Sequence, residues 1–440
     1  MGKYFVITYG CQMNLHESEK LSGILESFGY EKAQSELTAD VIVFNTCCIR
    51  ENAEDRAEGN IGALKKLKKS NKNLIIAVGG CMTQQQGAAE KLKEKFPFID
   101  IIFGTHNLDN FGELLSKRLS GKKSVISVLD KEQSICESTP KARNSYPNAW
   151  VNITYGCNNF CTYCIVPYVR GRERSRKKED IINECKSLLE QGYKEITLLG
   201  QNVNSYGKDL ENADFKGLVS EIAELPYKFR LRFMTNHPKD FTEDLAKVIS
   251  EHKNICPCIH LPVQAGSNRI LKMMNRHYTR EEYLEKVNAL RRYTPDVSIT
   301  TDIMVGFPSE TEEDFLDTYD LMQKVEFAGA FTFIYSKRSG TPAATYDGQI
   351  DEETSKRRIM KLISFQNALN RKKSKEYEGK TVEILCEDYD EKKGKYLGRD
   401  KYGRMAYFEG DSSLLGEFVM VKITKAGGIS LLGEIQEKGE

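Results

Sequence analysis

The sequence lacks the features that mark a secreted, membrane-bound or disordered protein. It holds a single tryptophan, and its positive and negative side chains nearly cancel, leaving a formal net charge of +1. No apolar run approaches the ~18 residues that suggest a membrane span, and no basic segment followed by an apolar one opens the chain. We therefore expect a cytoplasmic protein with no membrane partner. The neutral total predicts no general affinity for nucleic acid, although a basic patch can lie within a neutral chain.

With 440 residues, the chain is too long for one core, so several domains are expected. In the first ~125 residues, apolar strand-like runs alternate with helix-like segments, which predicts a doubly wound parallel sheet of the α/β class. The polar stretch Asp130–Asn148 is interpreted as a linker. From Trp150, six further strand–helix units favour a partial (β/α)6 barrel. Short strands broken by glycine and aspartate over Thr381–Glu437 predict a small all-β barrel.

Twelve cysteines are many for a cytoplasmic chain, where disulfides are disfavoured and clustered cysteines indicate metal or redox chemistry. Cys157, Cys161 and Cys164 form a C-x3-C-x2-C motif directly after a predicted barrel strand, where barrel folds carry their chemistry. Thiolates suit iron–sulfur clusters or zinc. Three thiolates would hold a cubane cluster and leave one iron open for a substrate. The alternative is a structural zinc site with a distant fourth ligand, for which this spacing is unusual.

A second set, Cys11, Cys47 and Cys81, is dispersed in sequence, but each member follows a predicted strand of the N-terminal sheet. The carboxyl ends of parallel strands lie along one edge, so we expect these thiols to converge at a ligand-binding crevice. Three unrelated core cysteines are the alternative. Of the adjacent pair, Cys47 is favoured over Cys48 because it directly follows the strand end, and one of the two is expected to point away; the sequence leaves the opposite choice open. The other five cysteines are interpreted as ordinary thiols and the histidines as structural.

The Cys157 motif, with Tyr163 before its third cysteine, resembles the radical S-adenosylmethionine (SAM) superfamily. Two three-cysteine sets in this order, followed by a small β-barrel, resemble the methylthiotransferase family nearly end to end. The strings TYGCQMN, NTCCIRENAEDR, GCMTQ, CIVPYVRGRERSR, LLGQNVNSYG, HLPVQAGS and VGFPSET are similar to its MiaB-type, tRNA-modifying branch. Cys48 and Cys258 depart from the residues usual in relatives, but neither is a predicted ligand.

The resemblance implies a methylthiotransferase domain (1–125), a linker (126–146), a radical SAM domain (147–374) and a TRAM domain (375–438). It also implies SAM and two [4Fe-4S] clusters. One, on Cys157, Cys161 and Cys164, would cleave SAM, and the other, on Cys11, Cys47 and Cys81, would deliver sulfur or a methylthio group.

The implied substrate is N6-isopentenyladenosine next to the tRNA anticodon. The C–H bond at carbon 2 of this base is aromatic and unactivated, so ordinary acid–base catalysis cannot act on it, which is a physical reason for radical chemistry. The base must also leave its stack. An electron donor such as flavodoxin or ferredoxin, a possible iron–sulfur carrier and a monomeric state are also expected.

Polar residues after the barrel strands are the expected SAM contacts, although loop capping is an alternative for the amides. They are Gln201, Asn202, Thr235, Asn236, Gln264 and Ser267. Tyr163 of the cysteine motif is a further expected contact, and Gly306 is expected to let the backbone approach the adenine of SAM.

The basic run Arg170, Arg172, Arg174 and Arg176 is interpreted as a phosphate or carboxylate clamp rather than a solvated face. In the C-terminal barrel acidic residues outnumber basic ones, so tRNA binding there needs a local face; a purely structural barrel is the alternative. The residues expected on that face are Lys395, Arg399, Lys401 and Arg404, with Lys392, Lys393, Tyr396 and Tyr402 beside them.

Two rival functions stay open at this point. An enzyme of the same class could modify a ribosomal-protein side chain or a different tRNA adenosine. A non-catalytic iron–sulfur RNA-binding protein or electron carrier is disfavoured by two clusters with open coordination and by the polar residues expected at the barrel mouth.

Overall fold

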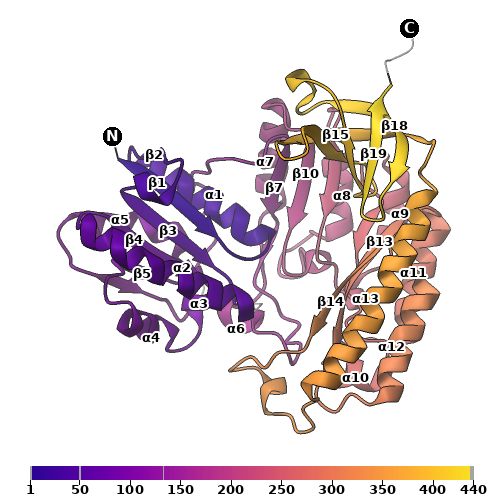
Figure 1. Ribbon diagram of the computed structural model, residues 1–440, viewed down its shortest axis with the longest axis horizontal. Coiled ribbons are helices and arrows are strands. Elements are labelled where there is room, and N and C mark those ends of the chain that lie inside the picture. The colour runs from indigo at the N-terminus through magenta and orange to yellow at the C-terminus, as the bar shows by residue number, and fades with distance from the viewer. Residues whose placement is uncertain (1, 49–50, 132, 437–440) are drawn as a thin grey trace. The chain divides into compact units, whose positions relative to one another are not determined.

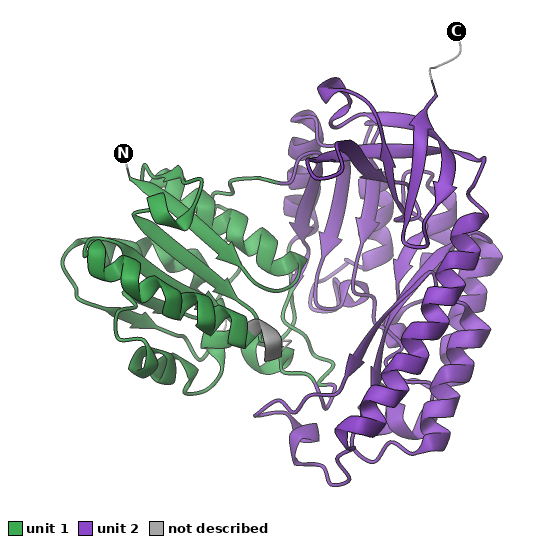
Figure 2. Cartoon of the chain, viewed as in Figure 1, with its two compact units in different colours: residues 1–144, 155–160, 164–176 green, residues 145–154, 161–163, 177–440 purple. Residues whose placement is uncertain are grey.

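The computed structural model describes residues 2–48, 51–131 and 133–436, and Figure 1 shows its elements. The chain divides into two compact units, coloured separately in Figure 2. Unit 1 takes residues from 1–144, 155–160 and 164–176, and unit 2 takes residues from 145–154, 161–163 and 177–440. The division passes through the Cys157 motif, because Cys157 and Cys164 belong to unit 1 and Cys161 to unit 2.

Unit 1 is built on a parallel sheet with strand order β2-β1-β3-β4-β5-β6. Its strands are β1 (Lys3–Thr8), β2 (Glu31–Lys32), β3 (Val41–Thr46), β4 (Ile75–Gly80), β5 (Ile101–Phe103) and β6 (Val125–Ser127). Its helices are α1 (Gln12–Ser27), α2 (Glu51–Ser70), α3 (Cys81–Gln84), α4 (Ala88–Lys95), α5 (Phe111–Leu119) and α6 (Val166–Arg170). From β1 the chain adds β2 on one side and β3 to β6 on the other, so the order of strand addition changes direction between β1 and β3 while all strands stay parallel.

The β3 strand explains why this sheet carries helices on both faces. Every residue of β3 is buried, and successive side chains point to opposite faces. Val41 and Val43 pack in one core with residues of α1 and α5, whereas Ile42 and Phe44 pack in a second core with residues of α2 and α4. The predicted doubly wound parallel sheet is confirmed.

In unit 2, two parallel three-stranded sheets, β11-β10-β7 and β12-β13-β14, share one core, and Leu231 and Ile255 form a parallel bridge near their junction. The strands are β7 (Asn148–Asn152), β10 (Glu195–Leu199), β11 (Arg230–Phe233), β12 (Cys258–His260), β13 (Ser298–Val305) and β14 (Gly329–Ile334). The helices are α7 (Lys178–Glu190), α8 (Phe215–Ala223), α9 (Glu243–Glu251), α10 (Asn268–Met273), α11 (Arg280–Tyr293), α12 (Glu312–Val325) and α13 (Glu352–Lys375). The short strands β8 (Thr154–Tyr155) and β9 (Arg174–Ser175) flank the cysteine motif. The predicted partial (β/α)6 barrel is confirmed.

After α13 the chain forms a closed barrel, β15-β16-β17-β19-β18, around its own small core. Its strands are β15 (Thr381–Asp390), β16 (Lys395–Arg399), β17 (Met405–Phe408), β18 (Phe418–Ala426) and β19 (Ser430–Ile435). This confirms the small all-β barrel expected from the sequence. Among the described residues, no helix has the length and apolar character to cross a membrane.

Buried arginines attach the closed barrel to the amino ends of the β10 and β11 strands. Arg230 donates to the carbonyl of Arg399 at 2.6 Å, and Arg232 donates to the carbonyl of Asp400 at 2.6 Å. Glu195, at the start of β10, lies 2.8 Å from Arg232 and 3.6 Å from Arg399. In barrels of this kind, residues at the amino ends of the strands serve stability, whereas those at the carboxyl ends serve chemistry.

Candidate active site

Three of the cysteines of unit 1 follow neighbouring strands. Cys11 follows β1 and precedes α1, Cys47 follows β3, and Cys81 follows β4 as the first residue of α3. The β1–β3 boundary, where the strand order reverses, is where open α/β sheets bind ligands. Gly10 makes the approach of the first two cysteines possible, because it has φ +120° and a Cβ there would lie 2.7 Å from that of Cys47.

Cys48 lies at the same site rather than away from it. Its side chain is 1% exposed and packs in an apolar cluster with Cys81, Ile165 and Val169. Since β3 ends at Thr46, the alternation of strand side chains no longer applies to Cys47 and Cys48. The expectation that one of these thiols points away from the other cysteines therefore does not describe Cys48.

The environment of Cys81 favours its thiolate. The hydrogen bond from Cys48 and the charge of the Arg170 guanidinium lower the pKa of Cys81 to about 7, although burial acts to raise it. The same contact and burial raise the pKa of Cys48 well above its usual range. Thiolate, not thiol, is the form that binds metal, so the surroundings of Cys81 suit a ligand.

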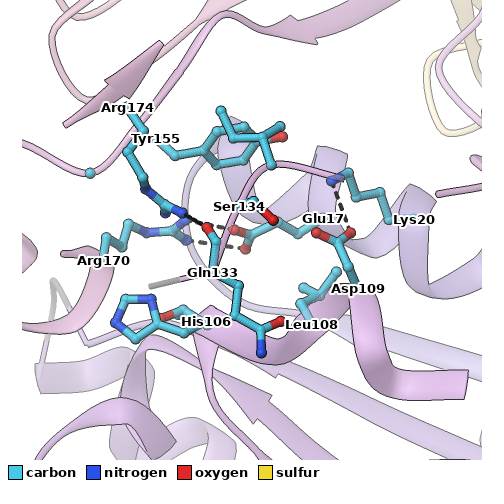
Figure 3. A pocket seen from close by; sticks show the side chains of 13 residues that line it. Glu17, Lys20, His106, Leu108, Asp109, Gln133, Ser134, Tyr155, Arg170 and Arg174 are labelled. Carbon is cyan, nitrogen blue, oxygen red and sulfur yellow. Dashed lines mark hydrogen bonds and ion pairs between the residues drawn. The ribbon is translucent and has the colours of Figure 1, made fainter. Parts of the chain in front are cut away.

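Arg170 is 5% exposed and forms a two-point ion pair with Glu17, with nitrogen–oxygen distances of 2.6 and 3.1 Å. Figure 3 shows this pair facing a cavity of about 50 Å³, room for one or two waters. Lys20 and Asp109 pair at 3.1 Å on the same wall. Arg170 was predicted to clamp a phosphate or a carboxylate; the phosphate role is incompatible with this placement, because the charge of Arg170 is used inside the fold on the carboxylate of Glu17.

The other three arginines of the run have different surroundings. Arg176 is 4% exposed and pairs with Glu137 at 2.8 and 2.5 Å, so it too is directed inward. Arg174 is half-buried and donates to the carbonyl of Gln133. Arg172 is exposed and stacks over the ring of Phe160 at 4.5 Å, which leaves it as the member of the run best placed for a ligand.

The Cys157 motif is held by backbone and arginine contacts within each unit. In unit 1, the N–H of Cys157 donates to the carbonyl of Gly171 at 3.1 Å. In unit 2, the buried guanidinium of Arg276 donates to Cys161 Sγ at 3.5 Å and to the carbonyl of Pro262 at 2.7 Å. Arg276 was not predicted, and no local pattern in the sequence singles it out.

Across the described residues, no three His, Cys, Asp or Glu side chains are gathered for a single metal ion. The ligands of one ion share a centre at about 2.0–2.3 Å, whereas the thiolates of a cubane bind separate irons. Each cysteine set supplies three soft sulfur donors after strand ends, and this donor set fits [4Fe-4S] clusters.

At the carboxyl ends of the barrel strands, some predicted SAM contacts hold the loops together. Asn202 donates to Asp240 at 2.7 Å and accepts from the N–H of His237 at 3.2 Å. Ser267 caps α10 and donates to Asp314 at 2.5 Å. These contacts match the loop-capping alternative for both residues.

The remaining predicted contacts differ in burial and in backbone conformation. Asn236 donates to the carbonyl of His260 at 2.9 Å, while its Oδ1 is buried without a partner. Gly306 has φ +72°, and a Cβ there would lie 2.4 Å from Ser355 Oγ, so the site demands glycine. Thr235 is exposed, and Gln264 is buried; both have positive φ, as strained residues at functional sites often do. Tyr163 and Gln201 are half-buried.

Three further polar residues of the barrel mouth escaped the sequence prediction. The hydroxyls of Thr154 and Tyr335 and the side-chain amide of Asn204 are buried without hydrogen-bond partners. Buried polar atoms normally have partners, so these fit the polar groups of a bound cofactor. The sequence feature that could have identified them is their position, because Thr154, Tyr335 and Asn204 come shortly after β7, β14 and β10, respectively.

A basic cleft of about 350 Å³ opens on the closed barrel, lined by Lys393, Lys395, Lys425, Tyr407 and Ser430 among others. Lys393 Nζ lies 3.6 Å from the centre of the Tyr407 ring. Lys395 pairs at 2.9 Å with Glu409, whose side chain is 85% exposed.

Of the four basic residues predicted on the closed barrel, Lys395 alone lines this cleft. Arg399 pairs with Glu387 at 2.9 Å and with Glu195, so it holds the barrel in place. Arg404 packs over Tyr377 at 4.1 Å, and Lys401 lies over Tyr402 at 5.0 Å.

The sequence matches three known families. The Radical SAM superfamily matches residues 151–322, the uncharacterized protein family UPF0004 matches 3–104, and the TRAM domain matches 375–435. Among solved structures, the radical S-adenosylmethionine methyltransferase TsrM of Kitasatospora setae has a TM-score of 0.57 at 14% identity, covering 78% of this chain and 77% of that one. The cobalamin-dependent S-adenosylmethionine radical enzyme OxsB has a TM-score of 0.54 at 14% identity, covering 84% and 56%. The fold and the cysteine motif thus define a radical SAM protein.

Relatives with assigned names narrow this class. The tRNA-2-methylthio-N(6)-dimethylallyladenosine synthase of Clostridium botulinum (strain Langeland) is 53% identical over 99% of this chain and 97% of its own length. The synthase of Clostridium perfringens (strain 13) is 54% identical over 99% and 98%. The chain belongs to the family of tRNA-2-methylthio-N(6)-dimethylallyladenosine synthases.

Proposed function

We propose that this chain converts N6-isopentenyladenosine (N6-dimethylallyladenosine) next to the tRNA anticodon to its 2-methylthio derivative. The observation that carries the proposal is the pairing of two three-cysteine sets, one after the strands of the N-terminal sheet and one at the mouth of a radical SAM barrel. A sequence over half identical to named synthases along nearly its full length supports the same reaction.

When bound, the two clusters supply an electron that cleaves SAM and a sulfur for transfer. Cys157, Cys161 and Cys164 would hold the first, and Cys11, Cys47 and Cys81 the second. Burial of Cys157, Cys161, Cys47 and Cys81 keeps water from the sulfur atoms. The target adenosine would have to leave its stack to reach the barrel mouth.

SAM would be bound by groups that the fold leaves unused at the barrel mouth. The buried Oδ1 of Asn236 can accept a hydrogen bond from it, and the hydroxyl of Tyr335 can accept or donate one. Gly306 would let the cofactor approach the backbone, as a residue without a side chain can, although the clash that a Cβ would make there is with Ser355 Oγ. Asn202 and Ser267 would act indirectly, because their hydrogen bonds hold the loops that carry these groups.

The tRNA would be engaged by the basic cleft of the closed barrel and by Arg172. In that cleft, Lys393, Lys395 and Lys425 can meet phosphates, and Tyr407 offers a face for an unstacked base. The ion pair of Lys395 with exposed Glu409 is weak enough to give way to a phosphate.

Further parts of the proposal concern organisation and partners. We keep the domain limits 1–125, 126–146, 147–374 and 375–438, of which residues 1, 49, 50, 132, 437 and 438 lie outside the described part. A flavodoxin or ferredoxin would donate electrons, an iron–sulfur carrier would repair the sulfur-donating cluster, and the chain would act as a monomer in the cytoplasm, where tRNA is found.

Mass spectrometry of tRNA nucleosides tests the function. A strain lacking the gene should accumulate N6-isopentenyladenosine, and the intact gene should restore the 2-methylthio nucleoside. Cys157→Ala and Cys81→Ala should each fail to restore it, whereas Cys136→Ala, at an exposed thiol, should succeed. Unchanged nucleosides in the deletion strain would contradict the proposal. The purified protein should carry roughly eight irons per chain when both cubanes are assembled.

A further inference from the structure

The segment that follows the Cys157 motif runs directly to the N-terminal cysteines. After Cys164, Ile165 and Val169 pack against Cys48 and Cys81 in one apolar cluster. Thr105 Oγ1 donates to the carbonyl of Val169, which fixes the α6 backbone there. Because Val169 packs against Cys81, the next residue, Arg170 at the end of α6, is placed beside this cysteine, and its charge acts to lower the pKa of Cys81. All of these residues belong to unit 1.

Glu17 holds this guanidinium in one orientation. Two of its nitrogens bind the two carboxylate oxygens of Glu17 at 2.6 and 3.1 Å, and the side chains are 5% and 7% exposed. A guanidinium has five N–H donors, so donors beyond those used by Glu17 remain for sulfur. A two-point pair also leaves the arginine little freedom to turn away.

Stability alone does not explain a buried charge pair at this place. Taking two charges out of water costs much of what their attraction returns, and apolar replacements of such pairs are often neutral or stabilising. Here the positive partner is next to a thiol that we propose as a cluster ligand. A cubane held by three thiolates carries net negative charge, and its reduced state carries one more.

We propose that Arg170 is a positioning residue for the cluster of Cys11, Cys47 and Cys81: locked by Glu17, it donates to the Cys81 sulfur and stabilises the reduced cluster. The inference rests on the proposed cluster at these cysteines. Hydrogen bonds to cluster sulfurs and nearby charge are two of the factors that set reduction potential. Loss of Arg170 therefore lowers the potential, whereas loss of the Glu17 charge, which partly cancels that of Arg170, raises it.

The test isolates the N-terminal cluster in the full-length chain by replacing Cys157, Cys161 and Cys164 with alanine. In this background, the iron content and the midpoint potential from an anaerobic redox titration followed by electron paramagnetic resonance are compared for Arg170→Gln, Arg170→Lys and Glu17→Gln. Arg118→Gln is the matched control, because Arg118 also pairs with a buried carboxylate, that of Asp100, in unit 1.

We expect a midpoint shifted to more negative values in Arg170→Gln, a smaller shift of the same sign in Arg170→Lys, a shift of opposite sign in Glu17→Gln, and none in Arg118→Gln. Lysine keeps the charge but not the two-point geometry, so it decides the question if Arg170→Gln fails to fold. An unchanged potential in both Arg170 variants, or shifts of one sign in the Arg170 and Glu17 variants, would overturn the inference. A background protein that binds no iron would instead remove the proposed cluster itself.

Discussion

The thiol of Cys48 is hydrogen-bonded to Cys81, whereas the neighbouring Cys47 lies against the glycine that precedes Cys11. Both cysteines of the pair are therefore at the site, Cys48 against Cys81 and Cys47 against Gly10. A cluster with three protein ligands needs only one thiol of this pair. Cys47 is the better candidate, because it directly follows the end of β3 as Cys11 and Cys81 follow β1 and β4.

Replacing each cysteine of the pair separately should distinguish them. Cys47→Ala should remove about half of the iron, since one of two cubanes is lost. Cys48→Ala should keep full iron content, because it removes a hydrogen bond and some packing but no ligand. Iron and sulfide assays after anaerobic reconstitution give the measurement. The reverse pattern, with iron lost only in Cys48→Ala, would transfer the ligand role to Cys48.

The sequence predicted the architecture because hydrophobic pattern reflects burial directly. Runs that begin with consecutive apolar residues, such as Val41–Thr46, form strands covered on both faces, and Cys11, Cys47 and Cys81 follow strand ends as expected. The exact placement of Cys48 could not be predicted from the sequence, because the period-two alternation that assigns side chains to the faces of a sheet ends where the strand ends.

Charged residues were harder to assign than cysteines. Arg170, Arg172, Arg174 and Arg176 look alike in sequence, yet Arg170 and Arg176 are buried against Glu17 and Glu137 while Arg172 is exposed. Their acceptors lie far away in the chain, and a single sequence carries no trace of such a pairing. The same holds for Arg399, whose carboxylate partner Glu195 starts a strand of the other barrel.

The attachment of the closed barrel should depend on Arg232. Its side chain is 7% exposed and pairs at 2.8 Å with Glu195, which is 1% exposed. Arg232→Met would take this partner away from the buried Glu195 carboxylate, a change that typically lowers the free energy of unfolding by about 3–5 kcal/mol. Thermal unfolding should show this loss, and limited proteolysis should cut more readily between α13 and β15.

The matched control for that variant is Arg292→Met. Arg292 pairs with Glu243 at 2.8 Å, but both side chains are more than half exposed, and such pairs contribute about 0–1 kcal/mol. Equal losses of stability in the two variants would argue against a special role for Arg232.

Asp314 should make stability depend on pH in the acid range. Burial acts to raise the pKa of Asp314, but hydrogen bonds from Arg269, Ser267 and Thr311 outweigh it and lower the pKa to about 2. A carboxylate whose pKa is depressed on folding stabilises above its unfolded pKa, about 3.9, and loses that contribution as pH falls towards 2.

The corresponding variant is Asp314→Asn, which removes the charge and weakens the cap of α12. It should lose at least about 1 kcal/mol at pH 6. Urea unfolding of both proteins between pH 6 and pH 2.5 should show the difference shrinking as the pH falls. A difference that stays constant over that range would mean that the charge of Asp314 contributes nothing.

The basic cleft of the closed barrel should bind tRNA through phosphates. Lys393 and Lys425 both line it, and the ammonium of Lys393 is held over the Tyr407 ring. Lys393→Gln and Lys425→Gln should each weaken binding of an anticodon stem-loop. Each should also reduce the slope of log K against log salt by about 0.7–0.9, the effect of one lost phosphate contact.

Lys401→Gln is the control for this cleft, because Lys401 is exposed on the same barrel over Tyr402 but does not line the cleft. Tyr407→Ala should weaken binding without changing the salt slope, since stacking of a base releases no counterion. Fluorescence anisotropy over a range of salt concentrations separates the two effects. If Lys401→Gln alone lowers the slope, the RNA crosses the barrel outside the cleft.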